Sequence, residues 1–280
     1  MSTHQTPQPP RLRLDLPAGR IEITTWDQPV TAVSVEPMND DQASIEAAAA
    51  VREDLRDVGG RQELIVEAPG KRSFLGFRRE PEIRYTIQAP HGCEVVCKTA
   101  SADVSALGRL GAVEITTVSG DITLGDVDGD AELKTVSGDV ESGRIAGSLE
   151  CSTVSGDLDV GPVGGDATTK SVSGDVRLAQ SGGSVGAKTV SGDVLLDAVS
   201  SGEVRIQTVS GDITVGVTPG ARLWMDVSTA SGSTESELDP LENDGLSREV
   251  DLRITGKSTS GDVRLFRAKA VAAGVQPAGK

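Results

Sequence analysis

Aromatic side chains are nearly missing from this 280-residue chain, which has two Trp, one Tyr and three Phe residues. The core must therefore be built from Val, Ile, Leu and Ala, and the aromatic platforms that commonly bind sugars are scarce. The chain also has 33 glycines. This composition favours thin, regularly stacked layers over a bulky globular interior.

Positive charge and long apolar runs are lacking too. The 27 Lys and Arg residues face 42 Asp and Glu residues, for a net charge of −15, so we expect no nucleic-acid partner. No apolar run reaches the roughly 18 residues of a membrane-spanning helix, and the N-terminus lacks a signal-peptide segment. The three cysteines do not resemble a disulfide framework. We therefore expect a cytoplasmic protein without a transmembrane segment.

Strand-like alternation dominates the first third of the chain. Residues 1–10 and 269–280 are predicted to be disordered tails, and residues 11–90 a β-rich region continuous with the repeats that begin at residue 91. One segment differs: the Ala-rich stretch that comes after Asn39 and ends at Gly59 and Gly60 predicts a short helix near residues 41–57.

A repeat governs residues 91–217. Its "SGD" aspartates recur every 18 residues. Each 18-residue repeat divides into two nine-residue units, such as "VSGDITLGD" and "VDGDAELKT". Val118, Gly120, Ile122 and Leu124 are predicted to face inward, and Asp121 outward. The pattern predicts an all-β fold, a single-stranded right-handed parallel β-solenoid with two nine-residue rungs per coil and one ten-residue rung near Ser200. Residues 218–268 are predicted to be irregular coils and a cap.

The chain resembles the bacterial β-strand-repeat family called domain of unknown function 4097, which is labelled "putative adhesin". The resemblance rests on the SGD steps, on "YTIQAPHGCEVVCKTASADV" and on "KSTSGDVRLFRA". It implies a single-stranded β-helix and no particular activity or functional residue.

Two interpretations of the stacked aspartates stay open. They could bind calcium, as β-rolls with nine-residue units do, or they could accept hydrogen bonds from backbone amides at a bend. The second is our prediction. Calcium β-rolls need the pattern G-G-x-G-x-D, whereas each nine-residue unit of this chain has one obligatory Gly. The structural repeat then consists of Gly120, Asp121, Gly138, Asp139, Gly156, Asp157, Gly174, Asp175, Gly192, Asp193, Gly211 and Asp212.

Catalysis and metal binding have little support in the residues. The carboxylates form a lattice in which every coil is alike, whereas an active site needs one coil that differs, so we expect no enzyme and no cofactor. His91, Cys93 and Cys97 form H-x-C-x3-C, but with all three facing inward along one strand the two thiols would be too far apart for one zinc ion. We expect them, with Cys151, to be buried as small hydrophobic residues.

One loop departs from the acidic character of the chain. The stretch "GKRSFLGFRRE" at residues 70–80 is basic and apolar, and it is a candidate contact for a protein partner, an anionic membrane surface or another copy. Its candidate residues are Lys71, Arg72, Phe74, Phe77, Arg78 and Arg79. The acidic stretch from Glu235 to Asp244 is a second place where the repeat fails.

The sequence as a whole predicts a non-enzymatic β-solenoid that serves as a scaffold or interaction module. We expect a protein partner or self-association through the ends or long faces. A calcium-dependent β-roll or adhesin-like surface protein is the alternative, and a carbohydrate-active β-helix enzyme is the third.

Overall fold

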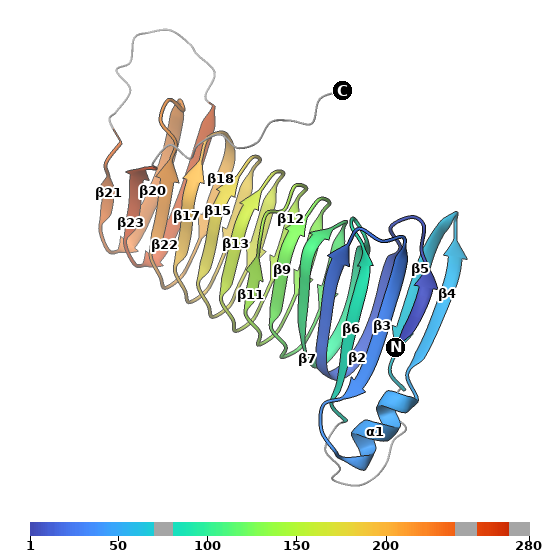
Figure 1. Ribbon diagram of the computed structural model, residues 1–280. Coiled ribbons are helices and arrows are strands. Elements are labelled where there is room, and N and C mark those ends of the chain that lie inside the picture. The colour runs from blue at the N-terminus through green and yellow to red at the C-terminus, as the bar shows by residue number, and fades with distance from the viewer. Residues whose placement is uncertain (70–80, 239–250, 269–280) are drawn as a thin grey trace.

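Residues that lie 18 positions apart pair with each other in the computed structural model, which describes residues 1–69, 81–238 and 251–268. Ala131 pairs with Leu149, and Val140 pairs with Leu158, both in parallel strands. Each turn of the chain therefore adds one strand to each of two rows. The predicted parallel β-solenoid with 18-residue coils is confirmed (Figure 1).

Row 1 contains the strand that precedes the repeated "TVSGD" corner in each coil. Its members are β8 (Val113–Thr116), β10 (Ala131–Lys134), β12 (Leu149–Ser152), β14 (Ala167–Lys170), β16 (Val185–Lys188), β18 (Gly202–Gln207), β22 (Leu252–Ser260) and β20 (Leu223–Ser231).

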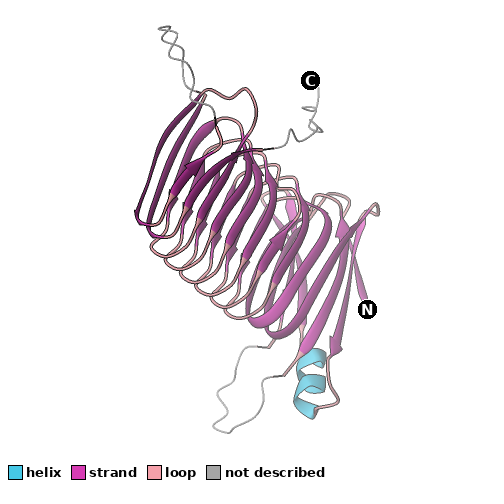
Figure 2. Cartoon of the chain, turned by 90° about the vertical axis from the view of Figure 1, so that its left-hand side faces the viewer, coloured by secondary structure: helices cyan, strands magenta, loops and turns pink. Residues whose placement is uncertain are grey.

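Row 2 contains the strand that comes after the corner. Its members are β9 (Ile122–Val127), β11 (Val140–Ser142), β13 (Leu158–Val163), β15 (Val176–Ser181), β17 (Val194–Val199), β19 (Ile213–Val217), β23 (Val263–Arg267) and β21 (Thr234–Ser236). The predicted ten-residue rung is present: Val194 pairs with Ile213, 19 positions on, and the register shifts after Leu196. Figure 2 shows the strands of successive coils stacked with their corners aligned.

Two long strands join the N-terminal region to the repeats. β2 (Arg11–Trp26) and β7 (Glu94–Leu110) each cover both rows, and they pair in parallel along most of their length. On its other side β2 pairs with β5 (Arg61–Glu67) in row 1 and with β6 (Ile83–Pro90) in row 2. The strands described between residues 11 and 90 are thus part of the same continuous sheet.

Antiparallel strands form the N-terminal edge of both rows. In row 1, β4 (Arg52–Val58) pairs with β5. In row 2, β3 (Val30–Pro37) pairs with β6, and β1 (Ser2–Gln5) pairs with β3. The prediction that residues 1–10 form a disordered tail is therefore wrong for Ser2–Gln5. Of these three pairs, β4–β5 is a hairpin with a short connection, whereas β2 separates β1 from β3, and β4 and β5 separate β3 from β6.

The predicted helix near residues 41–57 is only half correct. Helix α1 covers Gln42–Ala49, and the residues from Arg52 onward form β4 instead. Gly59 and Gly60 both have positive φ angles, of 64° and 83°. Two consecutive positive angles form the tight turn of a β-hairpin, so these glycines connect β4 to β5 and do not end a helix.

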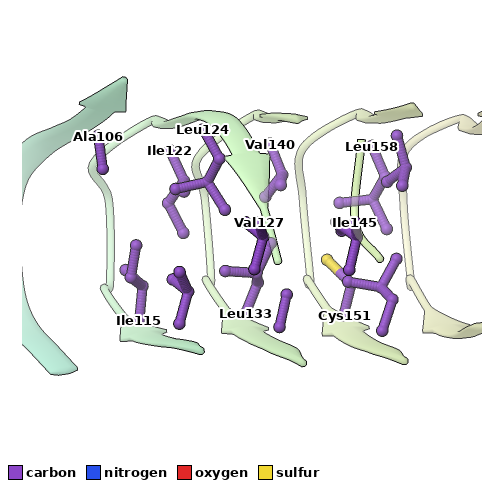
Figure 3. Close-up of a cluster of buried hydrophobic side chains, with 14 of the residues drawn as sticks. Ala106, Ile115, Ile122, Leu124, Val127, Leu133, Val140, Ile145, Cys151 and Leu158 are labelled. Atoms are coloured by element: carbon purple, nitrogen blue, oxygen red, sulfur yellow. The ribbon is translucent and has the colours of Figure 1, made fainter. Parts of the chain in front are cut away.

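The core is a stack of aliphatic side chains between the two rows. Ile115, Leu133 and Cys151 form one column of row 1, facing Val140 and Leu158 of row 2, and none of the five is more than 1% exposed (Figure 3). Burying a side chain of this size contributes about 2 kcal/mol. Because each column repeats from coil to coil, the stabilisation is spread evenly along the rod.

The last strands of the chain are inserted between earlier coils. β22 pairs with β18 on one side and β20 on the other, and β23 lies in the same way between β19 and β21. "KSTSGDVRLF" therefore continues the regular repeat, and the less regular β20 and β21 form the final coil. The sequence analysis grouped residues 218–268 as irregular coils and a cap, and it did not give the order in which these strands stack.

Candidate functional site: the TVSGD corner and the ladders along the rod

The "TVSGD" segments form the corner between row 1 and row 2 in six successive coils. In the coil of residues 153–157, Thr153 is 5% exposed, whereas Val154 is 44% exposed. The first Thr or Ser of the motif therefore faces the core, and the Val faces solvent. The buried members of this column are Thr117, Thr135, Thr153, Ser171, Thr189 and Thr208.

The prediction that Val118 faces inward with Gly120, Ile122 and Leu124 is therefore wrong for the valine. Val118 is 50% exposed, while Ile122 and Leu124 are buried as predicted. Strict alternation would place Val118, Gly120 and Ile122 on one face, but the chain bends at Val118 and Ser119. A bend interrupts the two-residue period of a strand, so the side-chain assignment shifts by one on its N-terminal side.

Six exposed valines result, one above another along the rod. They are between 42% and 51% exposed, and we call this column the valine ridge: Val118, Val136, Val154, Val172, Val190 and Val209. At about 4.8 Å per coil the ridge is roughly 24 Å long. Sequence reasoning missed it because the valines were assigned to the core.

The motif aspartates form a ladder of hydrogen bonds between coils. The backbone N–H of Asp139 donates to Oδ1 of Asp121 at 3.0 Å, and that of Asp157 donates to Oδ1 of Asp139 at 2.9 Å. The same bond joins the remaining members of the ladder, which are Asp103, Asp175, Asp193, Asp212 and Asp262. This is the interaction predicted for a corner residue, and each bond links two coils rather than closing one bend.

The ladder offsets its own charge repulsion. Neighbouring carboxylates at the coil spacing repel by roughly 1 kcal/mol in water. Each carboxylate accepts a backbone N–H, and hydrogen bonds to charged groups contribute about 1.5–3 kcal/mol where solvent is excluded, and less on a surface such as this. Among the described residues no group of three or more His, Cys, Asp or Glu side chains could hold a metal ion.

The motif glycines allow the coils to approach at this corner. A Cβ atom on Gly156 would lie 2.2 Å from the carbonyl oxygen of Gly138, and one on Gly138 would lie 2.0 Å from that of Gly120. Real Cβ atoms do not come so close to backbone, so no side chain fits at these positions. The repeated Gly is a packing requirement of stacked corners.

The buried hydroxyl groups in the corner are only partly satisfied. The N–H of Gly120 donates to Thr117 Oγ1 at 3.1 Å, and that of Gly138 donates to Thr135 Oγ1 at 3.0 Å. From the next coil onward the motif glycine donates instead to a serine carbonyl, as Gly156 does to Ser173 at 3.2 Å. Thr153 Oγ1 is then buried without a hydrogen-bond partner.

The three cysteines behave as small core residues, as predicted. Cys93, Cys97 and Cys151 are buried free thiols. Burial raises the pKa of Cys93 and of Cys151 to about 12, and it also raises the pKa of Cys97. None of them supplies a thiolate at neutral pH.

His91 was predicted to face inward with Cys93 and Cys97, and this is wrong. Its side chain is exposed, and its Nδ1 lies 2.8 Å from Thr25 Oγ1 in the neighbouring strand. The strand β7 begins only at Glu94, so the alternation of that strand does not extend back to His91. The H-x-C-x3-C pattern therefore does not bring its three side chains together.

The outer face of row 1 carries charge in columns. A groove of about 490 Å³ crosses it and is lined by Glu114, Glu132 and Glu150. Lys134 forms an ion pair with Glu132, and Lys170 Nζ lies 3.9 Å from Glu150. Surface pairs of this kind contribute about 0–1 kcal/mol each, so they balance the face more than they stabilise it.

The candidate loop at residues 70–80 and most of the acidic stretch from Glu235 to Asp244 lie outside the described residues. Their predicted roles stay predictions. In the described part of the chain, no helix is long and apolar enough to span a membrane.

The family model described as Toastrack DUF4097 matches residues 85–164 and 165–269, which contain all the corners described above. The chain belongs to this family. The match confirms the resemblance drawn from the SGD steps, and the Toastrack repeat in this chain is the coil with its Thr, Val, Gly and Asp columns. No curated protein matches the chain.

Two solved structures are similar to this Toastrack chain. One is titled a "putative adhesin" from Bacteroides fragilis, with 13% identity, a TM-score of 0.48 and coverage of 95% of each chain. The other is titled a "putative cell adhesion protein" from Clostridium sporogenes, with 11% identity, a TM-score of 0.26, and coverage of 95% of this chain and 98% of that one.

Proposed function

We propose that this protein is a non-enzymatic interaction module that binds a protein partner along the valine ridge. The observation that supports this is the exposure of the same apolar side chain in six successive coils. Scattered apolar residues on a surface need no explanation, but a contiguous apolar strip is typical of an interaction site.

The charges beside the ridge indicate the chemistry of the partner. The Asp ladder runs three residues after the valines, and its carboxylates are exposed to solvent. A partner with an apolar strip and basic residues on the ladder side would complement this surface. The ridge repeats every coil, so it suits an extended or repetitive partner better than a compact one.

The absence of catalysis is part of the proposal. Each carboxylate of the ladder is already engaged by a backbone amide of the next coil, as at Asp157, whose Oδ1 accepts the N–H of Asp175. The three thiols are buried with raised pKa values. These features make the ladder carboxylates and the thiols poor candidates for acid–base or nucleophilic catalysis.

Cross-linking in the cells that make the protein tests the ridge. A photoreactive amino acid at position 154 should give a defined adduct with one partner protein, while the same group in place of Glu141, on the outer face of row 2, should not. The triple variant Val136→Ser, Val154→Ser, Val172→Ser should lose the partner and keep the β-rich circular dichroism spectrum. Equal adducts from both positions, or a partner retained by the triple variant, would contradict the proposal.

We also propose that the protein acts in the cytoplasm. The motivating feature is the set of three unpaired thiols, which suits a reducing compartment. Cell fractionation with an antibody against the chain tests this part independently of the ridge. Recovery of the protein from the outer surface would overturn the cytoplasmic location and favour an adhesin-like role.

A further inference from the structure

The two ends of the rod are built differently. At the N-terminal end, Glu53 of the edge strand β4 pairs with the buried Val66, so its side chain faces the interior. There it accepts a hydrogen bond from Ser2 and lies 2.7 Å from His4 Nε2, both on the edge strand β1 of row 2. An inward-facing charge on an edge strand blocks pairing with another molecule, because pairing would bury the charge.

At the C-terminal end, the described part of the edge strands carries no inward-facing charge. Within the described residues β20 pairs only with β22, and β21 pairs only with β23. One side of each strand therefore presents backbone N–H and C=O groups with no strand partner in the described part of the chain. Strand β20 is nine residues long, which makes it a long edge.

The inward side chains of this final coil are uncharged, and one of them, Met225, is largely exposed. Met225 continues the column of Ile254 in the neighbouring strand, yet Met225 is 46% exposed and Ile254 is fully buried. Leu223 and Val227, on the same face of β20, are half-buried. In the described part of β20 and β21, every inward residue is uncharged: Leu223, Met225, Val227, Thr229, Thr234 and Ser236.

We propose that a second copy of this chain covers the C-terminal coil, so that two rods join tail to tail about a two-fold axis. Such an axis, perpendicular to the rod, makes every strand pair between the copies antiparallel, which is a good hydrogen-bonding geometry. The inward side chains of both final coils would then share one core. This inference concerns a surface other than the valine ridge and does not depend on the proposed function.

The contrast between the ends selects this arrangement over a head-to-tail one. A head-to-tail contact would place Met225 and its neighbours against the edge that carries Glu53, and it would bury that carboxylate against apolar side chains. It would also leave one open end at each stage and produce filaments. Tail-to-tail joining uses both unprotected edges and stops at two copies.

Sedimentation velocity and small-angle X-ray scattering of the full chain test the proposal. We expect a concentration-dependent dimer whose largest dimension is close to twice that of the monomer. Met225→Glu introduces an inward charge like that of Glu53, and it should raise the dissociation constant of the dimer by more than about tenfold. Val58→Glu, at an exposed apolar residue of the N-terminal edge strand, should leave the constant unchanged.

Cross-linking gives a second measurement that does not rely on weakening the contact. In Asp226→Cys, on the exposed outer face of β20, a bismaleimide should join two copies, because their C-terminal coils face each other, while Val58→Cys should stay uncoupled. The native cysteines are buried and do not compete. A monomer at all concentrations, a dimer no longer than the monomer, or coupling through position 58 instead of 226 would overturn the proposal.

Discussion

Asp139 and Asp157 are joined across two coils by a hydrogen bond of 2.9 Å from the backbone N–H of Asp157 to Oδ1 of Asp139. Each aspartate of the ladder is thus a donor through its backbone and an acceptor through its side chain. The ladder therefore needs an acceptor oxygen at every step, but it does not need the negative charge. This distinction separates a structural ladder from a cation site.

Substitution of Asp157 tests that distinction. Asp157→Asn keeps an oxygen that can accept the N–H of Asp175, and it removes one repelling charge, so we expect a change in the free energy of unfolding of less than about 0.5 kcal/mol. Asp157→Ala removes the acceptor and should cost about 1 kcal/mol. Urea unfolding followed by circular dichroism measures both.

Neither calcium nor EDTA should change the free energy of unfolding of Asp157→Asn relative to that of Asp157→Ala. If Asp157→Asn were as damaging as Asp157→Ala, and the difference from the original chain disappeared in EDTA, the carboxylate charge would be serving a cation. The calcium interpretation would then replace the structural one.

A methyl group added to the glycine column should be among the most damaging small changes. Gly156→Ala places a Cβ atom 2.2 Å from a backbone oxygen of the preceding coil, so two corners must separate. We expect a loss of about 3 kcal/mol or more. Gly186→Ala, where the nearest atom to the new Cβ is a Thr168 side-chain oxygen 3.9 Å away, should be close to neutral. Similar melting temperatures for the two variants would contradict this account of the corner.

The burial of Thr153 predicts a stabilising substitution. Its hydroxyl is buried without a partner, so Thr153→Val should keep the shape and raise the free energy of unfolding by about 1 kcal/mol. Thr135→Val should instead lower it, because Thr135 Oγ1 accepts the N–H of Gly138. Val154→Thr, on the exposed ridge, should change little. If Val154→Thr proved the most damaging of the three, the inward assignment of the valines would be right after all.

The 18-residue period could be predicted from the sequence, whereas the orientation of the corner could not. Parallel stacking aligns identical residues in successive coils, so the spacing of the SGD steps directly gives the register. At Thr153 and Val154 the two side chains have nearly the same shape, and hydrophobicity alone favours the valine as the buried one. The outcome depends on a bend in the backbone, which an apolar–polar pattern does not encode.

The order of the C-terminal coils could not be predicted from the sequence pattern either. Gly261 belongs to a regular repeat unit and packs against Gly211, so β22 and β23 take their place beside the regular coils. The earlier and less regular β20 is displaced to the end. Sequence order predicts spatial order only when each new coil is added to the last, and here long-range pairing decides.

Acid titration tests Asp15, a carboxylate outside the "TVSGD" motif. The fold disfavours the charged form of this side chain. Asp15 lies on an exposed face, but partial desolvation raises its pKa above the ordinary value of 3.8; the cross-strand neighbour Glu67 adds to the increase, while Lys98 on the other side opposes it. A raised pKa means that the folded chain holds this proton more tightly than the unfolded chain. The charged form therefore lowers stability at neutral pH.

Asp15→Asn should consequently raise the free energy of unfolding at pH 7. The gain should shrink as the pH falls through the raised pKa and vanish below the ordinary value of 3.8, where Asp15 is protonated in both states. Glu141→Gln, on the exposed face of row 2, serves as the control and should have little effect on the free energy of unfolding at pH 7 or at pH 3. A gain that persisted unchanged at pH 3 would show that the amide stabilises the fold by its contacts and not by removing a charge.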